Sequence, residues 1–203
     1  VDVCELSPEE SIATNLQGVS NVVSSVEENL AALTDLETVL MVSTDKACSP
    51  INVYGMCKSI SERIVTSQAA IFSKEKIKFV GTRYGNVLDS RGSIIPLFKY
   101  QAKNNDYITI TDDRMTRFVM TLDESVDLII NAVKIANSGE ILIPKLKAMK
   151  IKDLAKIYSE LSNKPVKSIG IRPGEKIDEK LICKAESLRV VDIGDYYVLK
   201  PAH

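Results

Sequence analysis

The sequence predicts an α/β fold with an open, mostly parallel sheet, and two observations lead to that prediction. Residues 39–42 form a short continuous apolar run, as expected of a strand buried on both faces, and residues 77–80 hold a second such strand. Each of these strands follows a longer segment in which apolar residues recur at helical spacing. This alternation of helices and strands favours a sheet of parallel strands covered by helices.

The first half of the chain predicts two helices beside these two strands. Ser7, Pro8 and Glu9 are typical of an N-cap, a first helical position and an acidic first turn. The helical pattern then continues to about Leu33. A second helix is predicted between the two strands, from about residue 52 to residue 72.

The pattern changes after residue 86 and predicts a smaller α/β lobe interwoven with the first. We expect helices at 92–103, 123–136 and 151–161, strands at 107–110, 116–122 and 140–144, and a strand, a turn and a short helix within 167–183. The predicted larger domain comprises residues 1–88 and 118–144. The predicted smaller lobe comprises residues 89–117 and 145–203.

The composition is that of an ordinary soluble globular protein. Of the 203 residues, 45% are hydrophobic and 26% are charged. Acidic residues number 27 and basic residues 26, so no excess of charge directs the chain toward nucleic acid or a membrane surface. No apolar run is long enough to span a bilayer, and no signal peptide opens the chain. We therefore expect a cytoplasmic protein with no nucleic-acid or membrane partner.

Cysteine and histidine usage predicts that the protein has no metal site. The four cysteines lack a paired Cys-x-x-Cys spacing, which is typical of reduced thiols in a cytosolic protein. The only histidine is the last residue, His203, which argues against a histidine-based triad or zinc site. The chain begins at Val1 rather than Met and enters a helical pattern almost at once, so we expect that its front is missing.

A polar cluster directly follows the first predicted strand. Ser43, Thr44, Asp45 and Lys46 come at its carboxyl end, where open α/β sheets bind their ligands. An adjacent carboxylate and amine at such a place can act as a general acid and a general base. The alternative interpretation is a capping turn with an ion pair in solvent.

A tyrosine and a lysine follow one helical turn apart. Tyr54 and Lys58 stand at i and i+4 of the second predicted helix, so their side chains share one face. A nearby ammonium favours the phenolate, which predicts a lowered pKa for Tyr54 and a useful base. The spacing alone also occurs on solvated helices, and the polar cluster before it is what favours a site.

Further polar groups follow the second predicted strand and the later turns. Asn86 can donate to a phosphate or a sugar oxygen, and residues 90–93 open a helix that could bind an anion. Arg117 and Arg172 lie in two later polar clusters, and paired guanidiniums suit a pyrophosphate. By themselves, the segments around Asn86 and at 90–93 are more typical of turns than of a site, and the two arginine clusters are equally compatible with ordinary surface charge.

Taken together, these motifs resemble the extended short-chain dehydrogenase/reductase superfamily, and within it the inverting UDP-N-acetylglucosamine 4,6-dehydratases. The likeness runs from Pro8 to Tyr197. Its markers are Ser-Thr-Asp-Lys, Pro-Ile-Asn-Val-Tyr-Gly-x-x-Lys, Arg-Tyr-Gly-Asn-Val, Ser-Arg-Gly-Ser, Ile-Thr-Asp-x-Arg-Met-Thr-Arg-Phe and Arg-Pro-Gly-Glu-Lys. The resemblance implies a Rossmann-like, doubly wound parallel sheet. The larger domain would then be the remainder of an NADP-binding domain, and the smaller lobe would bind a UDP-sugar.

The resemblance also implies catalytic roles. Thr44 would hydrogen-bond the sugar 4-hydroxyl, and Tyr54, tuned by Lys58, would remove its proton while hydride passes from C4 to NADP. Lys46 would then take the C5 proton as base, and Asp45 would act as acid on the departing 6-hydroxyl. Hydride returns to C6, and reprotonation of C5 from the opposite face inverts that centre.

Binding roles follow from the same likeness. Asn15, Ser43 and Tyr84 would line the cofactor together with Tyr54 and Lys58, and Lys58 would touch the nicotinamide ribose. The substrate-binding positions implied in this way are Asn86, Arg117, Arg172 and Glu175. The resemblance implies NADP, with NAD as the alternative, and a homo-oligomer.

Two departures from the family pattern qualify these expectations. Asp89 stands where relatives usually have a small residue. The sequence contains no Gly-x-x-Gly-x-x-Gly loop, which binds the cofactor pyrophosphate in this family, so residues 1–203 alone are expected to be inactive. Two alternatives therefore stay open: a truncated, non-catalytic UDP-sugar-binding module, and a UDP-sugar 4-epimerase. Epimerases share Tyr-x-x-x-Lys but lack the adjacent Asp-Lys, which argues against the second alternative.

Overall fold

The computed structural model describes residues 2–202, which form two compact units. The first unit comprises the chain up to Tyr84, Val126–Lys145, and the chain from Lys180 on. The second unit comprises Gly85–Ser125 and Leu146–Glu179. None of the helices within residues 2–202 combines the length and the apolar character that a bilayer crossing requires.

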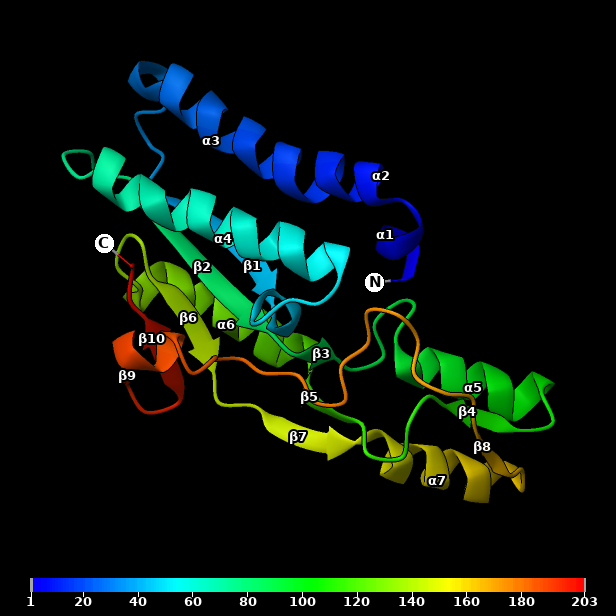
Figure 1. Cartoon of the computed structure of the whole chain (residues 1–203). Coiled ribbons are helices and arrows are strands. Elements are labelled where there is room, and N and C mark those ends of the chain that lie inside the picture. Colours follow the sequence, from blue (N-terminus) through cyan, green and yellow to red (C-terminus); the bar gives the residue numbers. More distant parts are fainter. Residues whose placement is uncertain (1, 203) are drawn as a thin grey trace. The chain divides into compact units, whose positions relative to one another are not determined.

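A five-stranded sheet with the order β1-β2-β6-β10-β9 forms the centre of the first unit (Figure 1). β1 (Thr38–Thr44), β2 (Lys78–Tyr84) and β6 (Ile141–Pro144) are parallel. β10 (Tyr196–Leu199) and β9 (Val190–Asp192) continue the sheet in antiparallel fashion. The predicted mostly parallel sheet is therefore confirmed, and its two buried strands are β1 and β2.

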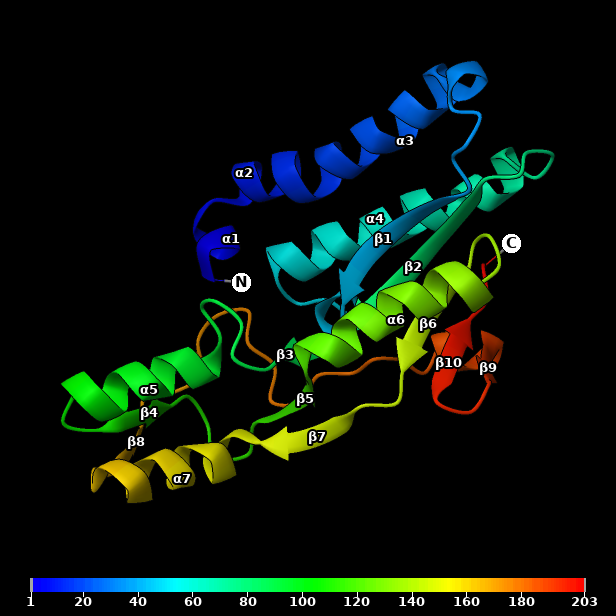
Figure 2. The same cartoon turned by 180° about the vertical axis from the view of Figure 1, so that it is seen from behind.

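Helices cover both faces of this sheet, as a doubly wound fold requires. α3 (Gly18–Glu28) and α4 (Val53–Ile71) lie over one face, and α6 (Leu122–Ile135) lies over the other (Figure 2). The chain enters α3 through α1 (Asp2–Leu6), α2 (Pro8–Ile12) and a π-helical turn at Ala13–Gln17. The single helix predicted from Ser7 is therefore a nearly continuous helical segment, in which α-helical hydrogen bonds give way to π-helical ones at Ala13–Gln17.

Apolar side chains of α3, α4, β1, β2 and the residues flanking them make the core of this unit. The buried members are Val23, Val26, Met41, Val65, Phe72, Ile77 and Phe79. The Phe72 and Phe79 rings lie 4.9 Å apart, centroid to centroid. Each such side chain stabilises the fold by about 1.5–3 kcal/mol when it is fully buried. Because the core needs apolar residues at the buried positions of each element, the first half of the sequence shows clear helical and strand patterns.

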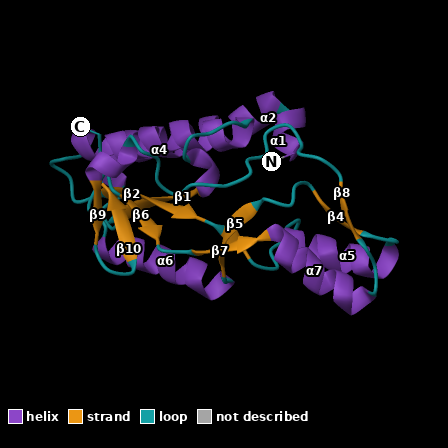
Figure 3. Cartoon of the chain, turned by 60° about the horizontal axis from the view of Figure 1, so that its bottom comes forward, coloured by secondary structure: helices purple, strands orange, loops and turns teal. Residues whose placement is uncertain are grey.

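The second unit is built on two small sheets. β3 (Asn86–Val87), β5 (Thr116–Met120) and β7 (Lys147–Lys150) form one sheet, and β4 (Ile108–Ile110) pairs in parallel with β8 (Val166–Ser168). Figure 3 shows α5 (Ile94–Asn104) and α7 (Ile151–Ser162) beside one another in this unit. Its buried core comprises Phe98, Ile108, Ile110, Met115, Ile151 and Ala155.

Two of the predicted domain boundaries differ from these units. We expected residues 180–203 in the smaller lobe, but β9 and β10 belong to the large sheet because β10 pairs with β6. We expected residues 118–125 in the larger domain, but β5 pairs with β3 and β7 of the second unit. The short helix expected within residues 167–183 is absent from the described chain. A 3₁₀ turn at Glu186–Arg189 lies just after that segment.

Candidate active site

The Ser-Thr-Asp-Lys cluster folds into a tight turn at the carboxyl end of β1. Thr44 is the last residue of β1 and caps the 3₁₀ turn Asp45–Ala47 by accepting a 3.3 Å hydrogen bond from the Lys46 amide. The Thr44 hydroxyl donates to Asp45 Oδ1 at 3.0 Å, and Lys46 Nζ donates to the same oxygen, also at 3.0 Å. Asp45 Oδ1 therefore accepts hydrogen bonds from both the Thr44 hydroxyl and the Lys46 ammonium.

This acid–amine pair is not the ion pair in solvent that the sequence left open as an alternative. Asp45 is fully buried, with 0% of its surface exposed, and the Lys46 side chain is 18% exposed. The second oxygen, Asp45 Oδ2, is buried and has no hydrogen-bond partner within residues 2–202. An unsatisfied buried acceptor is costly, and such groups are often found at functional sites.

The start of α4 packs directly on this turn. Asn52 caps the helix, and its Oδ1 accepts a 2.7 Å hydrogen bond from the Gly55 amide. A Cβ on Gly55 would lie 2.3 Å from the carbonyl oxygen of Lys46, so only glycine lets the helix approach so closely. Asn52 and Gly55 are functional positions that were not predicted from the sequence, although both stand in the Pro-Ile-Asn-Val-Tyr-Gly motif.

Tyr54 and Lys58 lie on α4 as predicted, but their electrostatics differ from the expectation. Lys58 Nζ lies 6.0 Å from the centroid of the Tyr54 ring and donates to the Val42 carbonyl at 3.2 Å. Burial raises the pKa of Tyr54, and the nearby Cys4 and Asp45 raise it further. The predicted lowering by Lys58 was therefore wrong, because loss of hydration and neighbouring negative charge outweigh an ammonium held beside the ring.

The three further residues expected to line the cofactor lie near the same strand ends or against α4. Ser43 is buried and donates to Glu62 Oε1 at 2.6 Å. Tyr84 ends β2 and stands opposite Thr44 in the parallel ladder. Asn15 lies in the π-helical turn, where its side chain donates to the Ser11 carbonyl and its own carbonyl accepts from Ser61 of α4.

In the second unit, one cavity brings together all four residues expected to bind substrate. Its volume is about 320 Å³. Asn86, Arg117, Arg172 and Glu175 line it, together with apolar side chains of α5 and α7. Ligand cavities commonly measure roughly 300–1,000 Å³ with a few polar groups on apolar walls, and this cavity matches that description.

The polar groups of this cavity are held in defined positions. Arg172 Nη2 lies 2.7 Å from Glu175 Oε1; burial raises the pKa of Glu175, but the hydrogen bonds from Arg172 outweigh it, so the pKa is lowered. Arg117 donates to the Ile177 carbonyl at 3.0 Å. Asn86 Oδ1 is buried without a partner among the described residues. The cavity thus offers two cations, one anion and a spare buried acceptor.

Asp89, where the sequence departs from its relatives, is an exposed turn residue. Its backbone is left-handed, with φ of 57°, and its carboxylate pairs with exposed Lys99 at 2.9 Å. Glycine adopts this conformation with less strain, and aspartate is one of the few other residues that tolerate it.

Comparison with known proteins places the chain in a family. The profile of the polysaccharide biosynthesis protein family matches residues 1–201. The chain belongs to that family. Members of the polysaccharide biosynthesis protein family therefore provide the context for the two clusters described above.

Three relatives show how far the likeness extends. A UDP-glucose 4-epimerase of Rickettsia bellii is 41% identical over 97% of this chain and 57% of its own length. A UDP-N-acetylglucosamine 4,6-dehydratase (inverting) of Campylobacter jejuni is 38% identical over 100% and 59%. The solved structure of Pen from Bacillus thuringiensis is 36% identical, with a TM-score of 0.90, over 98% of this chain and 63% of that one. The chain thus spans about 60% of the length of these relatives, and its Rossmann-like fold is confirmed.

Proposed function

We propose that the protein is a nucleotide-sugar 4,6-dehydratase that converts UDP-N-acetylglucosamine to a UDP-4-keto-6-deoxy sugar with inversion at C5. The observation that carries the proposal is the buried Asp45–Lys46 pair at the end of β1, with the Tyr54 helix packed directly on it. Oxidation of a hydroxyl needs only one acid–base group, whereas elimination of water needs an acid and a base in addition. The dehydratase relative from Campylobacter jejuni supports the same assignment.

The residues around Tyr54 fit the ribose end of a nicotinamide cofactor. A lysine ammonium has three donors, and Lys58 uses one at the Val42 carbonyl. Tyr54 lies one helical turn before Lys58 on α4, so both side chains would be able to meet a ribose or sugar hydroxyl. When bound, NADP would accept hydride from C4 and later return it to C6. Residues 1–203 lack the glycine-rich loop for its pyrophosphate, and NAD is the alternative cofactor.

In the first step, residues of α4 and of the end of β1 would act on the sugar 4-hydroxyl. Thr44 would hydrogen-bond this hydroxyl, and Tyr54 would take its proton. The raised pKa of Tyr54 makes the phenolate the minor form at neutral pH, so proton removal is expected to become faster as pH rises.

In the second step, Asp45 and Lys46 would act on C6 and C5. The 3.0 Å contact lets one proton move from Lys46 Nζ to the carboxyl group, which turns an ion pair into an acid and an amine. Lys46 then takes the C5 proton while the C6–O bond breaks, and the oxygen leaves as water with the Asp45 proton. The spare Asp45 Oδ2 is the oxygen best able to hold that proton, since Oδ1 already accepts from two donors.

The second unit would hold the UDP-sugar in its cavity. Arg117 and Arg172 provide the guanidiniums, and Glu175 keeps Arg172 in place through their ion pair. A guanidinium suits a phosphate because its planar fork can donate two parallel hydrogen bonds. Asn86 adds a buried acceptor for a sugar or base donor.

The test is to incubate the protein, expressed from its complete reading frame, with UDP-N-acetylglucosamine in deuterated water and to follow the product by NMR. A dehydratase yields a 4-keto sugar with a C6 methyl group and with deuterium at C5 in the inverted configuration. Retention of the 6-hydroxyl and of the C5 proton, with inversion at C4 instead, would identify an epimerase, which the Rickettsia relative favours. Binding without turnover would identify a non-catalytic module and overturn the proposal.

A further inference from the structure

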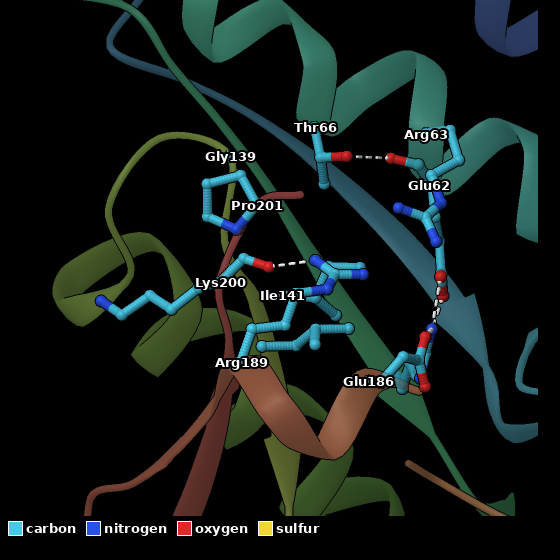
Figure 4. A pocket seen from close by; sticks show the side chains of 11 residues that line it. Glu62, Arg63, Thr66, Gly139, Ile141, Glu186, Arg189, Lys200 and Pro201 are labelled. Atoms are coloured by element: carbon cyan, nitrogen blue, oxygen red, sulfur yellow. Dashed lines mark hydrogen bonds and ion pairs between the residues drawn. The ribbon is translucent and has the colours of Figure 1, made fainter. Parts of the chain in front are cut away.

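A fully buried arginine joins three elements of the first unit. Arg83 of β2 is 2% exposed. Its Nη2 lies 2.7 Å from Glu62 Oε2 of α4 and 2.6 Å from Glu186 Oε1. Its Nη1 donates to the Leu181 carbonyl at 2.7 Å. Figure 4 shows the side chains of Glu62 and Glu186 directed toward one another.

The two carboxylates bind this guanidinium in matching ways. Glu62 receives Arg83 Nε at 2.9 Å in addition to Nη2, and Glu186 receives Nη1 at 2.9 Å in addition to Nη2. Each glutamate is therefore a bidentate partner, and each is buried. Removal of either one costs Arg83 a bidentate partner, so Glu186 is the control for that loss, although Glu186 also accepts from the Cys183 amide at 3.0 Å and from the Cys48 thiol at 3.6 Å.

The two glutamates differ in how they meet the site at the end of β1: Glu62 contacts the strand residue before Thr44, whereas Glu186 accepts from the Cys48 thiol beyond the turn at 3.6 Å. Glu62 Oε1 accepts the 2.6 Å hydrogen bond from Ser43, the residue directly before Thr44 and Asp45. Glu62 also lies one helical turn after Lys58 on α4. Burial lowers the pKa of Lys58, and the negative charge of Glu62 opposes that shift.

We propose that Glu62 is a positioning residue for the dehydratase reaction: it holds the end of β1 through Ser43 and places its negative charge one helical turn from Lys58 on α4. Arg83 holds the Glu62 carboxylate in place through its Nε and Nη2 hydrogen bonds. The inference rests on the proposed function for its kinetic consequence, but the electrostatic influence of Glu62 on Lys58 can be tested without any turnover.

The first test is an NMR titration of lysine labelled with ¹³C at Cε, with the Lys58 signal assigned through Lys58→Arg. In Glu62→Gln the pKa of Lys58 is expected to fall, because the ammonium loses its nearby carboxylate. In Glu186→Gln it is expected to stay as in the wild type. An equal shift in both variants, or none in Glu62→Gln, overturns the inference. This outcome does not depend on dehydratase activity, so it is separable from failure of the proposed function.

The second test is kinetic and uses the protein from its complete reading frame with UDP-N-acetylglucosamine. Glu62→Gln is expected to lower kcat roughly tenfold with KM within about twofold, since small displacements of reacting groups cost this much or more. Glu62→Asp should restore part of kcat, and Glu186→Gln should lose thermal stability while keeping kcat within about twofold. If Glu62→Gln does not fold, Ser43→Ala removes the same hydrogen bond with less disruption. Equal kcat losses in Glu62→Gln and Glu186→Gln, or an unchanged kcat in Glu62→Gln or Ser43→Ala, contradict a positioning role.

Discussion

Asp45 and Lys46 are neighbours in sequence that the turn after β1 makes partners in space. Their 3.0 Å contact, with Asp45 fully buried, is the geometry on which the proposed acid and base roles rest. Burial strengthens the attraction between the two groups, because bulk water would screen their charges.

At this scale the first prediction concerns Lys46 as the base at C5. Lys46→Ala should stop solvent deuterium from entering C5 and lower dehydration by about 10²–10⁴-fold, the usual contribution of a general base. NMR of the sugar in deuterated water measures both quantities. Lys156→Ala, which removes a lysine that is 75% exposed, serves as the control. Normal deuterium exchange in Lys46→Ala would show that another group takes the proton.

The second residue-scale prediction is the pH dependence of oxidation at C4. Because the pKa of Tyr54 is raised, its phenolate fraction is small at neutral pH and grows as pH rises. The rate of C4 oxidation, measured in single turnovers, should therefore increase with pH through neutrality and into the alkaline range. Tyr54→Phe should abolish oxidation at every pH, while Tyr107→Phe, at a partly exposed tyrosine of the second unit, should keep the wild-type profile. A rate that is flat across neutral and alkaline pH would contradict this role.

At the scale of elements, the close packing of α4 on the turn after β1 depends on one glycine. Gly55→Ala would place a methyl group 2.3 Å from the Lys46 carbonyl oxygen, a backbone atom that cannot rotate away. We expect a loss of about 1–3 kcal/mol in the free energy of unfolding, as for other overpacked sites, together with a fall in activity as the turn shifts. Urea denaturation measures the first effect.

Gly18 of α3 supplies the matched control for this substitution. A Cβ there would lie 3.9 Å from the Ala13 carbonyl oxygen, an ordinary contact distance. Gly18→Ala should therefore stabilise the protein by about 0.5–1 kcal/mol, because alanine favours a helix more than glycine does. Equal effects of the two substitutions would show that α4 does not depend on the close approach at Gly55.

At the scale of the whole molecule, β1 is the outermost strand of the large sheet. Its free edge presents backbone groups that pair readily with another strand, and Val42 on it is 39% exposed. Residues 1–203 alone should therefore self-associate, with an apparent mass in analytical ultracentrifugation that rises with protein concentration. A monomer of good solubility at all concentrations would contradict this expectation.

The strands β1 and β2 and the helices α4, α5 and α7 were predictable because apolar periodicity is a local property of the chain. The placement of residues 180–202 was not predictable, because the pairing of β10 with β6 joins segments more than 50 residues apart in the printed sequence. The role of Arg83 was likewise not predictable, since the sequence showed it only as part of the Arg-Tyr-Gly-Asn-Val motif. Its two glutamate partners lie on α4 and in the turn at Glu186–Arg189.

The sequence by itself determined which groups the site contains: a threonine, an acid and an amine after a buried strand, and a tyrosine and a lysine one helical turn apart. Those relations depend on neighbours along the chain, which strand and helix geometry place predictably. Only the tertiary structure decided the direction of the Tyr54 pKa shift, the burial of Asp45 and the link from Glu62 to Ser43. Burial and charge come from side chains that are distant in sequence and meet only when the chain folds.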